Sequence, residues 1–158
     1  MESINNKKIA IIGFGKEGVS VANWFGLTNQ ISIFDDKLKQ AIDPILFDHL
    51  KVKDVDFYFG ANHSRDLSFD FITRSPGVRP DHPLIQKIVK SGATLTSATK
   101  IFFDKSPAKI IGVTGTKGKG TTSTLIFKML KTKFADVYLA GNIGTPVLDI
   151  LPNLSSKS

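Results

Sequence analysis

The fold of this chain is decided by a stretch near its start, Lys8-Ile9-Ala10-Ile11-Ile12-Gly13-Phe14-Gly15-Lys16-Glu17-Gly18. The apolar, mostly β-branched run that ends at Ile12 predicts a buried strand. Apolar side chains then recur at helical spacing between Val19 and Leu27, so a helix is expected next. A G-x-G-x-x-G pattern between strand and helix is typical of a nucleotide-diphosphate site. Its first glycine permits a tight turn, the second admits a phosphate to the backbone, and the helix N-terminus presents N–H groups.

An acidic pair strengthens this interpretation. A second apolar run, Ile31–Phe34, ends at Asp35-Asp36, and Asp35 lies twenty positions after Gly15. A carboxylate at that place can accept a hydrogen bond from a ribose hydroxyl. The alternative is a glycine turn that only allows a helix and a strand to pack closely. Lys16 and Glu17 are bulky and charged where a dinucleotide site is usually small, which disfavours NAD.

Further apolar runs predict the rest of a sheet. Strands are expected at Val55–Phe59, Phe69–Thr73 and Thr94–Thr96, with a helix at Leu84–Lys90. Strands separated by helices, with continuous rather than alternating apolar character, predict a parallel sheet that is covered on both faces. The fold class is therefore α/β, with a Rossmann-like domain over residues 1–105.

A second unit is expected over residues 106–158. It has a predicted buried strand at Ala108–Val113, a helix at Thr121–Leu130 and a strand at Asp136–Leu139. Two strands and a helix do not close a core of their own. We therefore expect the chain to be the N-terminal part of a larger protein, or to be completed by a partner. A homodimer is one expected way to cover the exposed sheet edge.

The second unit carries the strongest motif, Gly112-Val113-Thr114-Gly115-Thr116-Lys117-Gly118-Lys119-Gly120-Thr121-Thr122. Glycines between a strand and a helix let successive N–H groups face an anion, and a lysine reaches β- and γ-phosphate oxygens. The expected phosphate-binding residues are Gly115, Thr116, Lys117, Gly118, Lys119, Gly120 and Thr121.

This loop predicts the start of a P-loop ATPase-type central domain. A hydroxyl of Thr121 or Thr122 in the first helical turn is the expected Mg²⁺ ligand. The pattern departs from the usual P-loop at Val113, where a glycine is common, and at Gly120, where a hydroxyl residue is common. The alternative is a flexible, lysine-rich surface loop. Two phosphate sites in this order suggest an enzyme that joins a nucleotide-carried substrate to a second molecule at the expense of ATP.

Composition and charge exclude or disfavour several classes of protein. The chain has 21 basic and 14 acidic residues, and no cysteine, which excludes disulfides and thiolate chemistry. Residues 105–158 hold eight lysines and two aspartates, so most of the net charge of +7 lies there. Nucleic-acid binding is disfavoured because no arginine follows Arg79 and basic residues do not interleave with aromatic ones. Neither a signal peptide nor a membrane helix is recognisable, so a cytoplasmic protein is expected.

Taken together, these residues resemble the Mur ligase family, most closely the branch that adds D-glutamate. The resemblance spans essentially the whole chain. It is carried by Ile11–Gly18, Phe34–Lys37, Ser75-Pro76-Gly77, Gly112–Thr122 and Gly141-Asn142-Ile143-Gly144. It implies a Rossmann-like domain for a UDP-linked substrate, a central ATPase and a C-terminal Rossmann-like domain. This chain matches the first and the opening third of the second.

The resemblance also implies chemistry. ATP, with Mg²⁺, would phosphorylate the carboxylate of UDP-N-acetylmuramoyl-L-alanine to an acyl phosphate, which the amine of D-glutamate attacks in peptidoglycan precursor synthesis. Lys119 would be catalytic, stabilising the β/γ-phosphate oxygens, and Thr121 would bind the metal. The implied UDP-substrate residues are Gly15, Lys16, Glu17, Asp35, Asp36, Lys37, Ser75, Gly77 and Asn142. The family usually carries smaller or neutral residues where Lys16 and Glu17 stand, which puts their side-chain roles in question.

Several family features are missing from the sequence. The resemblance implies an acidic Mg²⁺ ligand, a carbamylated lysine, a histidine near the metals and an amino-acid-binding domain. Because these features are missing from the sequence, we expect this chain alone not to catalyse the reaction. His49, His63 and His82 are interpreted as ordinary surface or turn histidines. Two alternatives stay open: a non-catalytic nucleotide-binding module, and another Mur or folylpolyglutamate-type ligase.

Overall fold

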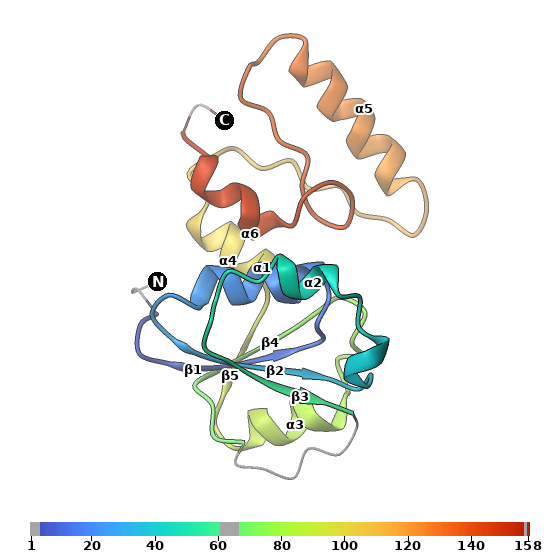
Figure 1. The fold of residues 1–158 in the computed structure, drawn as a ribbon. Helices are drawn as coiled ribbons and strands as arrows, with labels where there is room; N and C mark the ends of the chain where they lie inside the picture. Colours follow the sequence, from blue (N-terminus) through green and yellow to red (C-terminus); the bar gives the residue numbers. More distant parts are fainter. Residues whose placement is uncertain (1–3, 61–66, 157) are drawn as a thin grey trace. The chain divides into compact units, whose positions relative to one another are not determined.

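A computed structural model describes residues 4–60, 67–156 and 158 of the chain. The chain divides into two compact units, one ending at Lys100 and the other beginning at Ile101 (Figure 1). The domain boundary expected from the sequence, at residue 105, lies five residues after this division, at the end of helix Ala98–Lys105. We keep the boundary at residue 105 as a proposal. Residues 1–3, 61–66 and 157 lie outside the described residues, and so His63, interpreted above as an ordinary histidine, is not described.

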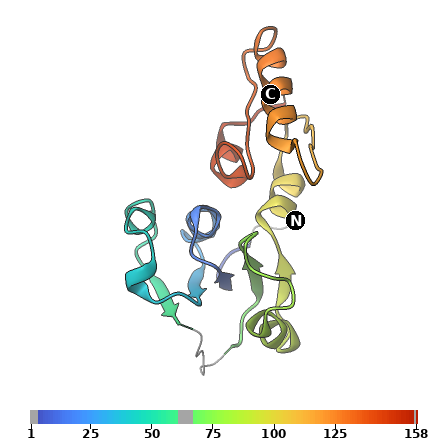
Figure 2. The ribbon, with the colours of Figure 1, turned by 90° about the vertical axis from the view of Figure 1, so that its right-hand side faces the viewer.

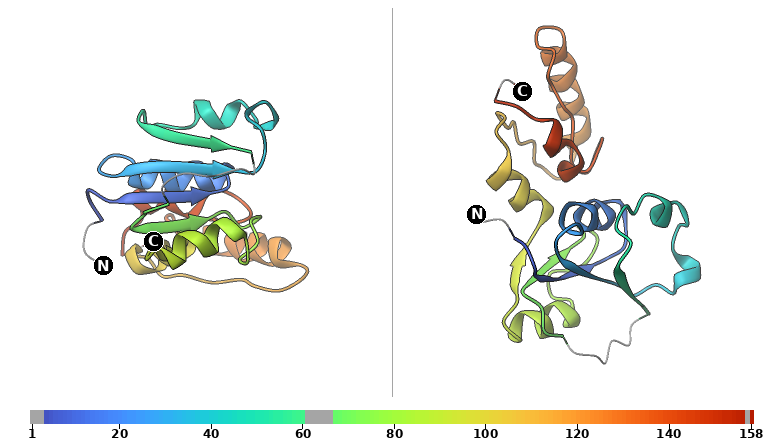
Figure 3. Two further views of the ribbon diagram at one scale, coloured as in Figure 1. Left: turned by 90° about the horizontal axis from the view of Figure 1, so that it is seen from below. Right: turned by 60° about the vertical axis from the view of Figure 1, so that its left-hand side comes forward.

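The first unit is built on a five-stranded parallel sheet. The strand order is β3-β2-β1-β4-β5, so β1 is central. Figure 3 (left) shows β2 and β4 on either side of β1. The bounds are β1 Lys8–Ile12, β2 Gln30–Asp35, β3 Val55–Phe59, β4 Phe71–Arg74 and β5 Thr94–Thr96. All five predicted strands are confirmed, with β4 starting two residues later than predicted.

Helices cover both faces of this sheet. Helices α1 (Lys16–Phe25) and α2 (Ile45–Asp48) lie on one face, and α3 (Pro83–Lys90) lies on the other (Figure 2). A short 3₁₀ helix, Lys39–Ala41, precedes α2. The predicted helix after β1 therefore exists but begins at Lys16 rather than Val19, directly after the second glycine. The short helix α2 was not predicted.

The core explains why the strand sequences are continuously apolar. On the α3 face, Ala10, Ile12 and Ile72 pack with Leu84, Ile85 and Ile88 of α3. The alternate residues of β1, Ile9 and Ile11, are fully buried as well. Successive side chains of a strand point to opposite faces, so burial of both sets requires cover on both faces. The sheet is therefore the doubly covered α/β type that the sequence predicted.

The second unit contains helices but lacks the predicted strands. Helix α4 (Ala98–Lys105) contains the division, and α5 (Lys119–Lys131) and α6 (Val147–Ile150) follow, with a 3₁₀ turn at Leu151–Asn153. The predicted strands at Ala108–Val113 and Asp136–Leu139 are wrong, because these residues form no strand. A strand needs a hydrogen-bonding neighbour, and the pairing in the described part of this unit is a single bridge between Ala140 and Thr145.

Helix α5 is confirmed close to its predicted bounds but has no fully buried residue. Its apolar side chains Leu125 and Met129 are 53% and 67% exposed. The buried apolar side chains of this unit come instead from α4 and from the stretch around α6. They are Ile101, Phe102, Leu148, Ile150 and Leu151. In the described residues, no helix has both the length and the apolar character needed to cross a bilayer.

Candidate functional site

The glycine turn lies where the strand order reverses. It follows the central strand β1, with β2 on one side and β4 on the other. Ligands of open parallel sheets bind outside the carboxyl ends of the strands at such a switch point. Backbone hydrogen bonds tie the turn to both neighbours: Gly13 N–H donates to the carbonyl of Phe34 (2.7 Å), and Ser75 N–H donates to the carbonyl of Ile12 (2.8 Å).

The three glycines of the turn have different roles. Gly13 has φ +97°, and a Cβ there would lie 2.9 Å from Cβ of Ser75. A Cβ on Gly18 would lie 2.3 Å from the carbonyl oxygen of Gly13, so this glycine lets α1 approach the turn. By contrast, a Cβ on Gly15 would meet no atom within 4 Å. Packing therefore accounts for Gly13 and Gly18, whereas Gly15 leaves the backbone open at the N-terminus of α1.

The side chain between the first two glycines anchors the turn. Phe14 is 3% exposed, and its ring meets those of Phe47 and Phe57 at centroid distances of 4.9 and 5.3 Å in edge-on geometry. Such aromatic pairs stabilise a fold beyond their burial. Because the ring is fixed between α2 and β3, the backbone of the turn is held in one position rather than left mobile.

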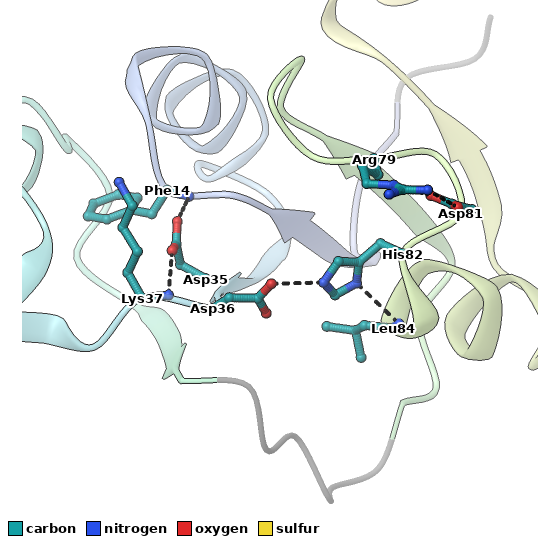
Figure 4. A network of polar contacts seen from close by, with 8 residues as sticks. All are labelled: Phe14, Asp35, Asp36, Lys37, Arg79, Asp81, His82 and Leu84. Atoms are coloured by element: carbon teal, nitrogen blue, oxygen red, sulfur yellow. Dashed lines mark hydrogen bonds and ion pairs between the residues drawn. The ribbon is translucent and has the colours of Figure 1, made fainter.

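Asp35 joins the turn to the loop after β2. Its Oδ2 accepts a hydrogen bond from Phe14 N–H (2.8 Å), and its Oδ1 accepts one from Lys37 N–H (2.9 Å) (Figure 4). Both oxygens therefore already hold backbone groups. The structure gives this carboxylate a positioning role that the sequence did not predict. A contact with a ribose hydroxyl would use its remaining lone pairs and stays a proposal.

Asp36 and Lys37 differ from Asp35 in exposure. Both are exposed, and Asp36 Oδ2 lies 3.0 Å from Nε2 of His82 (Figure 4). The sequence interpretation of His82 as an ordinary turn histidine missed this partner. Pro83 indicates that His82 precedes a helix, because proline is common at the first helical position, but no local signal indicates the contact with Asp36.

Ser75 and Gly77 lie in the loop after β4. Ser75 Oγ donates to the carbonyl of Gly13 (2.9 Å), so this hydroxyl also supports the glycine turn. Gly77 is exposed, and a Cβ there would meet nothing within 4 Å. The loop after β4 thus has an open backbone stretch beside the open stretch at Gly15.

Lys16 and Glu17 open α1. Lys16 is exposed and Glu17 is half-buried. Burial raises the pKa of Glu17 above its ordinary value, and the charge of Arg74 partly opposes this rise. The Arg74 guanidinium itself donates to the carbonyl of Val78 (2.8 Å). The positive charge of Arg74 therefore lies close enough to the first turn of α1 to favour the ionised form of Glu17.

The phosphate loop belongs to the second unit. Gly118 has φ +74°, in the left-handed region, and is the N-cap of α5. The first helical hydrogen bond runs from Thr122 N–H to the carbonyl of Gly118 (2.9 Å). The N–H groups of Lys119, Gly120 and Thr121 precede it, and such groups have no partner within the helix. They are therefore donors of the kind that a phosphate accepts.

The lysine of this loop closes on the loop itself, because the Lys119 ammonium donates to the carbonyl of Gly115. A cavity of about 550 Å³ adjoins the loop, lined by residues that include Gly118, Thr121 and Lys128. A Cβ on Gly120 would lie 2.1 Å from Cδ1 of Ile143, the far end of an exposed side chain that can move aside. The lining of this open cavity lies along α5 and Ile143, whereas the Lys119 side chain occupies the turn between Gly115 and the start of α5.

The remaining predicted residues are exposed. Thr116, Lys117 and the Thr121 proposed for Mg²⁺ are all exposed, as is Asn142. Asn142 lies in the turn held by Gly141 N–H, which donates to the carbonyl of Thr145 (2.9 Å). Across the described residues, no group of three or more histidine or acidic side chains is placed to hold a metal.

Comparison of the sequence with known proteins identifies a matching family. The model of the family "Mur ligase MurD-like, N-terminal domain" matches residues 7–97. The UDP-N-acetylmuramoylalanine--D-glutamate ligase of Clostridium tetani is 39% identical over 146 residues, covering 91% of this chain and 32% of that protein. The enzyme of the same name from Ruminiclostridium cellulolyticum is 35% identical over 158 residues, covering 98% and 33%. The chain thus spans about a third of the length of these relatives.

A solved structure of a 3-hydroxyacyl-CoA dehydrogenase from Archaeoglobus fulgidus is also similar, with 14% identity and a TM-score of 0.41. That similarity covers 59% of this chain and 34% of the dehydrogenase. At this level it carries no argument.

The different roles of the glycines can be tested by stability. Gly18→Ala should lower the free energy of unfolding by about 2–3 kcal/mol, because the added methyl overlaps the Gly13 carbonyl and forces α1 away. Gly15→Ala should cost about 1 kcal/mol or less, the ordinary loss from alanine at an N-cap. Urea unfolding followed by circular dichroism measures both. Equal losses in the two variants would contradict the assigned roles.

The raised pKa of Glu17 predicts a pH dependence. The folded chain holds the Glu17 proton more tightly than the unfolded chain, so stability falls as pH rises from the ordinary value of 4.5 through the raised pKa. Glu17→Gln should therefore raise the melting temperature at neutral pH by about 1–2 °C, with the difference vanishing below about pH 4. Asp54→Asn, which changes an exposed carboxylate before β3, is the control. A constant difference across the range would contradict the assignment.

Proposed function

Because the chain belongs to the Mur ligase family, through its MurD-like N-terminal domain, we propose that the first unit binds the UDP part of UDP-N-acetylmuramoyl-L-alanine. The observation that carries this proposal is the open backbone at Gly15. A diphosphate needs donors that it can approach closely, and the N-terminus of α1 supplies N–H groups and a favourable dipole there. The turn around Gly15 is fixed on three sides, by Phe14, by Asp35 and by Ser75.

The other contacts of the ligand follow from the neighbouring loops. Backbone groups of Lys16 and Glu17 would hold the diphosphate, and the exposed Lys37 would add positive charge. Asp35 and Asp36 would border the nucleoside, with Gly77 leaving backbone room beside it. Asn142, in the second unit, is proposed as a further contact on the strength of the resemblance. Support for this set comes from exposure and from the open positions at Gly15 and Gly77.

We further propose that the loop of the second unit binds the β- and γ-phosphates of ATP. The residues present fit this group: three N–H groups precede the first helical bond, and a lysine folds over the loop. Lys119 would exchange the Gly115 carbonyl for phosphate oxygens and would be the catalytic residue, because it neutralises charge on the transferring group. Thr121 offers one hydroxyl to Mg²⁺, a metal that often takes its other ligands from phosphate and water. When bound, ATP with Mg²⁺ supplies the phosphoryl group that activates a carboxylate.

In the whole protein this arrangement serves an ADP-forming ligase of peptidoglycan precursor synthesis, which we place in the cytoplasm. The substrate carboxylate becomes an acyl phosphate, and the amine of D-glutamate displaces the phosphate to form an amide. The residues described here bind and orient the two nucleotides. We propose that this chain does not turn over by itself, since its relatives are about three times as long.

Calorimetry tests the first binding step. The 158-residue chain should bind UDP-N-acetylmuramoyl-L-alanine, and Gly15→Ala should weaken binding by about tenfold, because a methyl group would separate the diphosphate from the backbone. The stability of the variant should remain close to that of the parent chain. NADH at the same concentration should neither bind nor compete. Tight NADH binding, or no heat with the UDP-linked ligand, would overturn the proposal.

A second experiment tests the phosphate loop. In the whole protein, Lys119→Ala should lower ADP release by at least about a hundredfold, because the lysine acts on charge that develops during transfer. Lys133→Ala removes an exposed lysine beyond α5 and should leave the rate unchanged. The 158-residue chain, supplied with ATP and both substrates, should release no ADP. Substrate-dependent ADP release by this chain would contradict the proposal that it does not turn over by itself.

A further inference from the structure

His82 connects two loops at the carboxyl edge of the sheet. Its Nδ1 accepts a hydrogen bond from Leu84 N–H (3.2 Å), which makes it the N-cap of α3. Its Nε2 lies 3.0 Å from Oδ2 of Asp36, in the loop after β2 (Figure 4). The His82 side chain is 21% exposed and that of Asp36 is 58% exposed. With Nδ1 accepting, Nε2 carries the proton in the neutral ring and donates to Asp36.

The loop after β2 is therefore held from two directions. Asp35 reaches the glycine turn through Phe14 N–H, and Asp36 reaches the opposite loop through His82. The two adjacent carboxylates take different partners: Asp35 bonds to the turn after β1, and Asp36 bonds to the loop after β4. The next residue is Lys37, whose N–H is bonded to Asp35 and whose side chain is exposed.

We propose that His82 is a positioning residue for the nucleotide site: it holds Asp36 and thereby sets where the Lys37 segment meets a nucleoside diphosphate. The inference rests on the proposed UDP-binding function. In this account Asp36 borders the nucleoside only while His82 holds it in place. Helix α3, fixed by burial of Leu84, Ile85 and Ile88, provides the rigid base from which His82 acts.

The chain offers a substitution that separates the two bonds of His82. His82→Asn keeps a side-chain acceptor at the N-cap, where asparagine is among the preferred residues. The shorter side chain does not reach Asp36. The matched control is Asp81→Asn, which breaks the exposed Arg79–Asp81 pair (2.6 Å) in the same loop. Both variants should keep the melting temperature of the parent chain within about 2 °C.

A double-substitution cycle provides the test, with UDP-N-acetylmuramoyl-L-alanine as the probe in calorimetry. His82→Asn and Asp36→Ala should each weaken binding by about three- to tenfold, the usual effect of one partly exposed charged hydrogen bond. The double variant should be no weaker than either single one, because the two residues act as a unit. If the two effects multiply, or if His82→Asn binds as the parent does, the proposal is overturned.

Backbone amide chemical shifts of the ligand-free chain, measured by NMR, test the positioning role of His82 independently of the proposed nucleotide binding. His82→Asn should move the amide signals of Asp36 and Lys37 in the ligand-free chain, and Asp81→Asn should not. Unmoved signals would overturn the positioning role whether or not the chain binds nucleotide. Failure of the parent chain to bind the probe, with the signals moved, would instead overturn the proposed function.

Discussion

The close approach of helix α1 to strand β1 is the constraint on which the rest of the structure depends. It exists because Gly18 lies against the carbonyl of Gly13, a separation that leaves no room for a side chain. The approach brings the N-terminus of α1 to the carboxyl end of the central strand. There the strand order reverses, with β2 on one side of β1 and β4 on the other, and the N–H groups of the helix N-terminus face outward from the sheet edge. The anion-binding position that we propose thus follows from a packing requirement.

The groups around the turn act together to fix it. Phe14 anchors it in an aromatic cluster, Asp35 holds its backbone from β2, and Ser75 holds it from β4. Each of these contacts joins segments distant in the sequence, so the turn is determined by the sheet order as much as by its glycines. A preformed backbone site of this kind binds without ordering a flexible loop, which lowers the entropic cost of binding. We propose that the loop before α5 uses the same chemistry, with N–H groups ahead of the first helical bond.

The sequence predicted the first unit well because its signals are local. Continuous apolar runs such as Ile9–Ile12 identify strands buried on both faces, and glycines identify the turn between strand and helix. The side-chain partners were not predictable, because Asp35 and His82 find them across the fold. In the second unit the apolar run at Ala108–Val113 predicted a buried strand and was wrong. Apolar character shows what a segment prefers to bury, but a strand also requires a neighbour, and these residues have none to pair with in the chain as described.

Amide chemical shifts of the isotope-labelled chain, recorded while UDP-N-acetylmuramoyl-L-alanine is added, measure the main claim most directly. Our account predicts that the amides of residues 14–17 move furthest and saturate together with the amide of Gly77, while those of α3 beyond its first turn stay in place. Saturable binding that leaves residues 14–17 unmoved would contradict it, because the ligand would then be held somewhere other than the glycine turn.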